Sequence, residues 1–314
     1  MPVPEPTPSA LEARLRREAE RALKEFGADG RVESSTYGVL ADRAATLEAR
    51  LAELGATPDE LAAVAVQRRT LEGVDRGRAG TQASPAQPKS AGYGRAVNVT
   101  ELESMTASLA LAGDAWRRAL LAHLRSIMRG DPDAVRDRLA LSLAALLRRA
   151  RLRPVLAGEG PRSAELDVGG WRVALAFGVC GDDTGSSARW LSEDFARRGR
   201  VGLIALECGG AIEPPAGGIV RGADDRAVMT ALGERLGAFL LDRQPAIAEA
   251  VSPDHTFGVI AHATLAGLNV ASGRLIFAEC WRIANLCDLD DPRVEHLQRL
   301  MRAIERSRSD EHER

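Results

Sequence analysis

Apolar residues in the first part of the chain recur at helical spacing. Leucines stand every seven residues with apolar residues between them, at Leu40, Leu47 and Leu54 with Ala44 and Leu51. Such a stripe lies along one side of a helix and forms the seam of a helical hairpin or coiled coil. We therefore predict a helical hairpin or coiled-coil arm over residues 1–73, which packs on its own neighbours or on another chain.

Capping signals place the helix starts in the first half of the chain. A Ser or Thr three residues before a Glu, a Pro at the first helical position, and an Asp-Pro pair are all typical of helix N-termini. These signals occur at Ser9, Thr57-Pro58, Thr100 and Asp131-Pro132, and a further helix is expected to begin near Ser35. The helix that begins at Thr100 is expected to run to about Met128.

The pattern divides the chain into further regions. Residues 74–98 are rich in Gly, Ser, Pro and Ala and lose all periodicity, which predicts a flexible linker. Residues 99–153 are expected to form an arginine-rich helical segment that packs on the C-terminal domain. The polar residues 307–314 are expected to form a disordered tail.

Residues 154–306 alternate between strand-like and helix-like patterns. Short apolar runs predict strands over 154–160, 163–168, 171–179, 201–208, 256–262, 266–270 and 274–280. Helices are expected over 186–199 and from 224 to 251, the latter interrupted near Pro245, and after Asp291. The fold class that we predict is α/β or α+β, with a helix-covered mixed sheet.

Composition and charge exclude several classes of protein. The net charge of −2 over 314 residues argues against a general electrostatic attraction to nucleic acid or to an anionic membrane. No apolar run reaches the roughly 20 residues of a membrane span. Four cysteines are too few for a disulfide scaffold. We therefore expect a cytoplasmic protein with no membrane partner.

The helical segment before residue 154 is locally basic. Candidate phosphate contacts are its arginines Arg117, Arg118, Arg125, Arg148, Arg149 and Arg151. One interpretation is that these arginines form a face that binds the phosphates of a nucleic-acid backbone. The alternative is that they lie on solvent-exposed helix faces without a ligand.

A glycine-rich loop follows the strand at 171–179. Gly178, Gly181 and Gly185 precede a helix, and Glu207 ends the next strand. This order resembles the first loop of class I S-adenosylmethionine-dependent methyltransferases. The resemblance implies that the three glycines approach the cofactor and that Glu207 binds its ribose. The alternative is an ordinary strand-to-helix turn.

The order of elements has a second resemblance. A helix, three strands, a helix and a strand from residue 136 to 208 resemble the core of nucleases of the PD-(D/E)XK type. Asp167 then corresponds to the first acid, but the strand at 171–179 lacks the Glu-x-Lys pair. The resemblance therefore implies a degenerate core that has lost the ligands for a catalytic metal.

The runs LIALEC and LIFAEC both end in Glu-Cys, at Glu207-Cys208 and Glu279-Cys280, and Cys180 ends a third run. We interpret the cysteines as buried core residues, since no Cys-x-x-Cys or close His pair indicates a metal site. We expect the two glutamates to pair with Arg172, Arg274 or Arg282. The alternative is one pocket that holds both acids.

No catalytic residue is assigned from the sequence. A Gly-x-Ser-x-Gly motif is absent, and His255 and His262 suggest a turn and a core position. The leading hypothesis is a non-catalytic protein that assembles through its N-terminal helices, with the α/β domain as scaffold or ligand sensor. A methyltransferase-like enzyme and a nucleic-acid-associated protein with the degenerate nuclease core are the alternatives.

Overall fold

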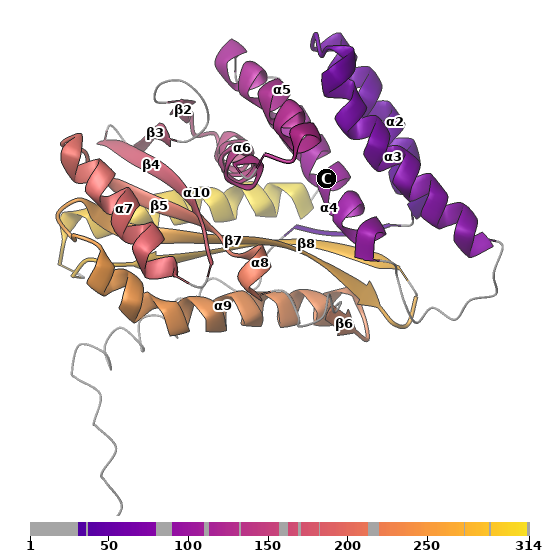
Figure 1. Ribbon diagram of the computed structural model, residues 1–314. Helices are drawn as coiled ribbons and strands as arrows, with labels where there is room; N and C mark the ends of the chain where they lie inside the picture. The colour runs from indigo at the N-terminus through magenta and orange to yellow at the C-terminus, as the bar shows by residue number, and fades with distance from the viewer. Residues whose placement is uncertain are drawn as a thin grey trace, which may run out of the picture.

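The computed structural model has a mixed α/β fold, as predicted, with a mixed sheet that carries helices on both faces (Figure 1). The structure describes residues 31–35, 37–79, 90–109, 113–131, 133–156, 163–168, 171–181, 183–212, 220–272, 274–288 and 290–312. The helix predicted to begin at Ser9 lies outside these residues.

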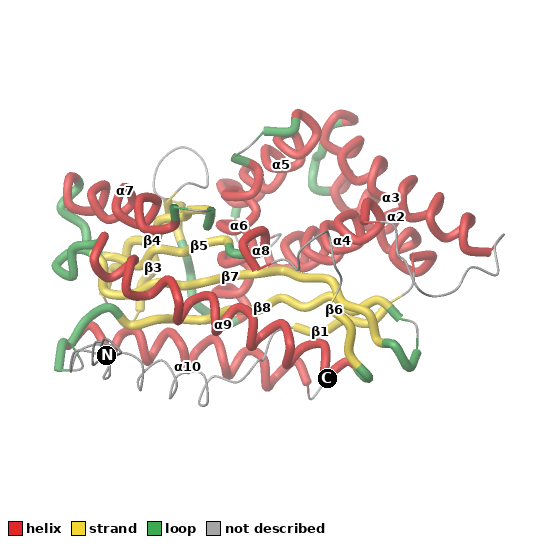
Figure 2. Tube along the Cα trace, turned by 60° about the horizontal axis from the view of Figure 1, so that its bottom comes forward, coloured by secondary structure: helices red, strands yellow, loops and turns green. Residues whose placement is uncertain are grey.

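The sheet contains both hairpins and parallel strands. Its strands are β1 (Arg31–Ser35), β2 (Val155–Leu156), β3 (Ser163–Val168), β4 (Trp171–Val179), β5 (Gly202–Glu207), β6 (Val220–Gly222), β7 (Thr256–Asn269) and β8 (Leu275–Asn285). Their order is β1-β8-β7-β5-β4-β3-β2, with β6 beside the far end of β7. The strands β4, β5 and β7 run parallel, and the β2–β3, β3–β4, β7–β8 and β1–β8 pairs are antiparallel. Figure 2 shows that the β7–β8 hairpin runs the length of the sheet.

Helices cover the two faces unequally. The helices are α2 (Tyr37–Glu53), α3 (Pro58–Ala79), α4 (Ser90–Leu109), α5 (Asp114–Arg129), α6 (Ala134–Arg149), α7 (Thr184–Arg197), α8 (Gly209–Ile212), α9 (Asp225–Ala250) and α10 (Pro292–His312). The helices α7, α8 and α9 pack on one face, which we call the α9 face. The helices α4, α6 and α10 pack on the other, the α6 face, where α2, α3 and α5 add a further layer.

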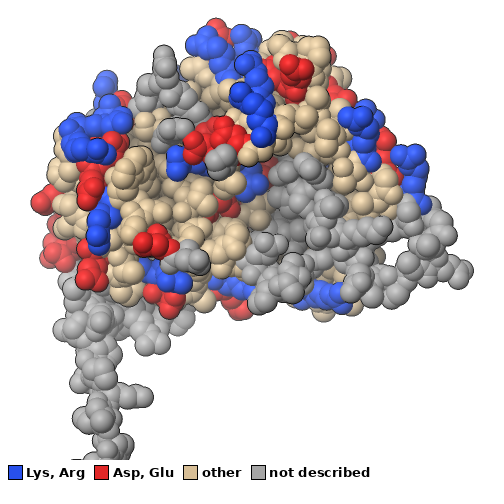
Figure 3. Space-filling model, in the orientation of Figure 1, with Lys and Arg blue, Asp and Glu red and all other residues tan. Residues whose placement is uncertain are grey.

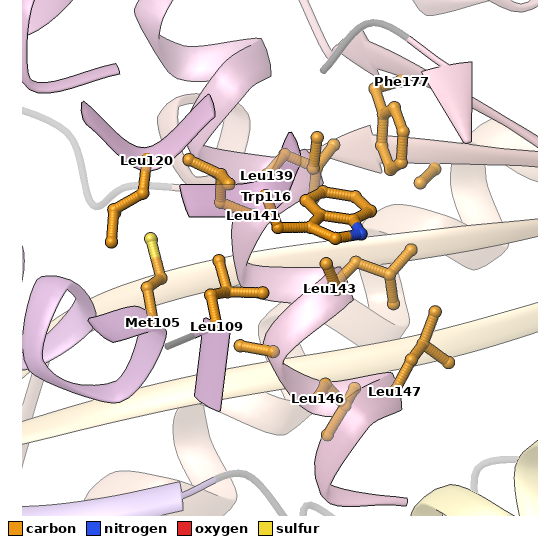
Figure 4. Close-up of a cluster of buried hydrophobic side chains, with 14 of the residues drawn as sticks. Met105, Leu109, Trp116, Leu120, Leu139, Leu141, Leu143, Leu146, Leu147 and Phe177 are labelled. Carbon is orange, nitrogen blue, oxygen red and sulfur yellow. The ribbon is translucent and has the colours of Figure 1, made fainter. Parts of the chain in front are cut away.

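The interior strands are apolar because both of their sides are covered. Every residue of β5 is buried, as expected for a parallel strand between helical layers. On the α6 face, Trp116 of α5 packs among leucines of α6, and its indole N–H donates to the carbonyl of Pro154 at 3.0 Å. Figure 4 shows these leucines around Trp116, with Phe177 of β4 nearby.

The predicted leucine seam is used inside the chain. Leu40, Leu47 and Leu51 of α2 are at most 2% exposed and belong to the core of the α6 face. The helix α2 packs against α3 and α4. The seam therefore packs on neighbouring helices of the same chain, which is one of the two outcomes predicted, the other being contact with another chain.

Several boundaries differ from the predictions in the helical half. Residues 31–35, within the predicted helical arm 1–73, form the edge strand β1, because β8 offers them a partner. The ends of the predicted linker 74–98 are helical, since α3 continues to Ala79 and α4 begins at Ser90. Thr100 therefore lies inside α4, where its spacing to Glu103 cannot mark a helix start.

The C-terminal half differs in three places. The helix α9 continues through Pro245, which is exposed and so lies on the solvent side of the helix, away from the core. Two short strands predicted over 256–270 are one strand, because β8 pairs with β7 from Gly258 to Leu268. The helix α10 extends to His312, so it occupies most of the predicted tail.

Candidate functional site

A histidine at the centre of the sheet joins two carboxylates. Glu207, the last residue of β5, lies opposite His262 of β7 in the parallel register. The Nδ1 atom of His262 is hydrogen-bonded to the Glu207 carboxylate. Its Nε2 atom lies 3.4 Å from Oε1 of Glu279 on β8. Trp281 stacks against the imidazole, with 4.0 Å between ring centroids.

Two arginines of α6 reach the same carboxylates from above the sheet. Arg138 and Arg149 are eleven residues apart, which places both on one side of a helix. The Arg138 guanidinium lies 4.0 Å from Glu207, and that of Arg149 lies 4.0 Å from Glu279. Arg138 is also 3.5 Å from Glu101 of α4, so α4, α6 and three strands contribute to one group of charges.

We call this group the central ion cluster and define it by its six residues, Glu101, Arg138, Arg149, Glu207, His262 and Glu279. It combines three carboxylates with two guanidinium groups and one imidazole. It is neutral when the imidazole is protonated and every carboxylate is ionised. Its centre is shielded from water: the His262 side chain is 0% exposed and that of Glu207 is 3% exposed.

The charges set the protonation state of His262. Burial by itself would lower its pKa, but Glu207 and Glu279 raise the pKa to about 10. Burial likewise opposes ionisation of Glu207, yet His262 and Arg138 hold its pKa below the usual value. Glu101 differs, because burial raises its pKa and Arg138 opposes this only in part.

This arrangement suits a structural cross-link better than proton transfer. A general base must be neutral near the working pH, whereas the raised pKa of His262 favours its protonated form. A buried ion pair of this kind connects elements that the hydrophobic core only packs together. Here it links α4 and α6 to β5, β7 and β8. Among the residues that the structure describes, no group of three or more His, Cys, Asp or Glu side chains could hold a metal ion.

The residues proposed for a methyltransferase-like loop come from α7 and from the adjoining ends of β4 and β5, where Val179 pairs in register with Glu207. Gly178 is inside β4, where a Cβ atom would be 3.0 Å from Leu191 of α7 and 3.1 Å from Leu206. It therefore permits close packing of α7. Gly181 and Gly185 follow on that side, but the Glu207 carboxylate lies on the α6 face, where His262 binds it. The Glu207 backbone thus lies beside the end of β4, while its side chain is bound by His262 on the face opposite α7.

The strands around Asp167 have the connectivity of the second resemblance. The helix α6 leads to the antiparallel β2–β3–β4, and α7 leads to β5 parallel to β4. Asp167 is exposed on β3 and pairs in register with Arg172. Since alternate residues of a strand share a face, the next β4 residues on this side are Ala174 and Ala176, which carry no metal ligand.

The cysteines are buried, as the sequence predicts, and two of them touch. The Sγ atoms of Cys180 and Cys208 are 3.1 Å apart, at the ends of β4 and β5 on the α9 face. Cys208 follows Glu207 and so faces away from His262. Cys280 lies on the same face as the pair and Cys287 on the α6 face.

The two Glu-Cys runs therefore separate into two groups on opposite faces. Glu207 and Glu279 meet at His262, so one buried group holds both acids, as in the alternative that the sequence left open. Among their arginine neighbours are Arg138 and Arg149 of α6, which were not assigned to them from the sequence. In addition, Glu279 does not end a strand, because β8 continues to Asn285.

The arginines proposed to contact nucleic acid differ in their surroundings. Arg149 faces inward and donates to Ser104 Oγ at 2.7 Å. Arg125 pairs with the buried Glu60 at 2.6 Å and Arg117 with Asp114 at 3.0 Å. Arg118 and Arg151 are exposed.

Sequence reasoning missed Arg138 and Glu101 and treated His262 as an isolated core residue. The available signal was the eleven-residue spacing of Arg138 and Arg149 on one helix. Glu101 had no comparable signal, because its partner is set by the packing of α4 on α6.

Comparison of the chain with protein-family models, curated proteins and solved structures found no match. None of the described helices combines the length and the apolar character that a membrane crossing requires.

Proposed function

We propose that this chain is a non-catalytic cytoplasmic interaction protein whose α/β part acts as a scaffold. The observation that carries the proposal is the central ion cluster. Within it, His262 and Arg138 neutralise the Glu207 carboxylate inside the protein, and the histidine is 0% exposed. A catalytic group needs the opposite, a proton that can leave and access to a substrate.

The outer side of α2 is the candidate assembly surface. Since Leu40, Leu47 and Leu51 are buried in the core, a partner must contact the other side of α2. Val39 lies there and is 51% exposed, one of the few large apolar side chains on the described surface.

Light scattering on the full chain tests assembly. We expect an oligomer whose mass falls to that of the monomer in Val39→Arg. The matched control is Val270→Arg, since Val270 is 59% exposed in a turn distant in sequence from α2. A full-length protein that is monomeric at high concentration, or an oligomer that both variants leave intact, would exclude this surface as the self-association site.

A nucleic-acid-associated protein is the second candidate, and the connectivity of α6, β2, β3, β4, α7 and β5 favours it. This is the order expected for the degenerate nuclease core, with Ala174 and Ala176 on the side of Asp167. Such a core retains its shape but lacks the ligands for a metal. Binding without cleavage is the activity that remains.

The mixed charge of the surface predicts a low affinity for nucleic acid. Figure 3 shows basic and acidic side chains interspersed over this face of the molecule. Arg117 is 44% exposed although it pairs with Asp114, and Arg118 is also exposed, so phosphates can approach both side chains of α5 from solvent. Binding through them is expected to be weak and to decrease steeply with salt.

Fluorescence anisotropy with a labelled DNA duplex tests this candidate. We expect binding at low salt, no cleavage with Mg²⁺, and a salt slope reduced by about one for each arginine contact removed in Arg117→Ala and Arg118→Ala. The control variant is Arg299→Ala on α10, 49% exposed. Absence of binding at low salt would refute the candidate, and cleavage would refute the non-catalytic role.

A further inference from the structure

The two cysteines at the ends of β4 and β5 form a thiol pair of defined geometry. Val179 and Glu207 are partners in the parallel register, so Cys180 and Cys208 are the next pair along it. The Cys180 N–H donates to the Glu207 carbonyl at 2.8 Å, and the Cys208 N–H to the His262 carbonyl at 2.7 Å. These bonds fix both backbones where the Sγ atoms are 3.1 Å apart.

We propose that Cys180 and Cys208 form a reversible disulfide when the protein meets a peroxide, which makes this pair an oxidative modification site. Neighbouring strands lie about 4.8 Å apart, which is within the range of Cα separations that a disulfide spans. The sulfur atoms need to approach by about 1 Å to bond.

The two thiols have different roles. Cys180 is the nucleophile, since it is 7% exposed against 1% for Cys208 and is followed by the exposed Gly181. A hydrogen bond from Cys208 lowers the pKa of the Cys180 thiol. The same contact and burial raise the pKa of Cys208, which therefore stays protonated. A small oxidant such as hydrogen peroxide reaches Cys180 first.

The reaction balances with one peroxide. The Cys180 thiolate attacks one oxygen of hydrogen peroxide, an S–O bond forms, the O–O bond breaks, and the leaving hydroxide takes up a proton as water. The sulfur of Cys208 then attacks Cys180, the S–S bond forms, the S–O bond breaks, and the hydroxyl leaves as water with the thiol proton. Two thiols are oxidised, one peroxide is reduced, and two waters are released.

The other cysteines provide internal controls. Cys280 pairs in register with Ala263, so a whole strand separates it from the row of Cys208. It is buried on the same face but is too far away for a bond to either thiol. Cys287 lies in the core of the other face.

Thiol counting and peptide mapping of the full chain test the proposal. The chain contains four cysteines, and trypsin places each on its own peptide, with Cys180 on 173–189 and Cys208 on 201–221. After treatment with hydrogen peroxide, we expect the number of reactive thiols in the denatured protein to fall by two. A linked 173–189/201–221 peptide should appear and should disappear after reduction with dithiothreitol.

Variants separate the pair from general oxidation. Cys208→Ser should abolish the linked peptide and leave a sulfenic acid at Cys180 that dimedone traps, whereas Cys280→Ser should form the disulfide as the native chain does. Circular dichroism confirms that each variant is folded. The proposal is overturned if all four thiols survive peroxide, if Cys280 or Cys287 is oxidised first, or if the linkage joins two chains.

Discussion

Replacing His262 by glutamine removes the positive charge at the centre of the ion cluster. Glu207 and Glu279 then lose their shared partner while both remain largely buried. Removing one partner of a buried ion pair typically costs about 3–5 kcal/mol. We expect the free energy of unfolding at neutral pH to fall by this amount.

The pH dependence distinguishes the loss of a charge from the loss of packing. The pKa of His262 is raised from 6.5 to about 10 in the folded protein. A group whose pKa is raised on folding stabilises the folded state fully at pH values below its unfolded pKa. This contribution to the free energy of unfolding is lost as the pH rises through the folded pKa. At about 1.36 kcal/mol per pH unit, the native protein should lose about 3 kcal/mol between about pH 7 and pH 9.5.

Urea unfolding followed by circular dichroism measures this effect. The stability difference between the native chain and His262→Gln should shrink from neutral to alkaline pH, because the native protein loses the contribution that the variant already lacks. His255→Gln, which alters a histidine bonded to the Arg200 carbonyl, is the control and should keep the native pH profile. A difference that stays constant with pH would show that His262 is neutral and that the reasoning about the cluster is wrong.

Three further substitutions test the packing and the helix contacts. Gly202→Ala should lower the free energy of unfolding by about 2 kcal/mol or more, because the added Cβ atom meets a backbone carbonyl of β4. The control Gly210→Ala should be nearly neutral, because the space around Gly210 is open. Equal losses in thermal unfolding would contradict this reasoning. Leu51→Ala should cost about 2–5 kcal/mol and lower the urea midpoint of the whole chain, and Val39→Ala should change it little. Glu60→Gln should lower the free energy of unfolding by about 1–3 kcal/mol above pH 5. Since the pKa of Glu60 is lowered in the folded protein, the difference from the native chain should vanish as acid protonates the native carboxylate. A difference that persists in acid would assign the effect to packing.

Much of the fold was accessible from local patterns. The seven-residue spacing of leucines predicted α2 and its buried side, and Thr57-Pro58 marked the start of α3. The Thr57 N–H donates to Glu60 at 2.7 Å, as a capping arrangement requires. These features depend on residues a few positions apart, which is why the sequence reveals them.

The strands β1 and β7 show where local patterns fail. Residues 31–35 become a strand only because β8 pairs with them, a contact more than 200 residues away in the chain. The full length of β7 is likewise set by its hairpin with β8. Pairing partners of this kind leave no mark in a short window of sequence.

The sequence by itself determined that three apolar runs carry Glu207, Glu279 and the cysteines Cys180, Cys208 and Cys280. Only the tertiary structure decided their partners. Adjacent residues of a strand face opposite sides of the sheet, so each Glu-Cys pair divides between the two faces. Packing of α6 on one face then places arginines beside the acids, and the parallel register on the other places Cys180 against Cys208.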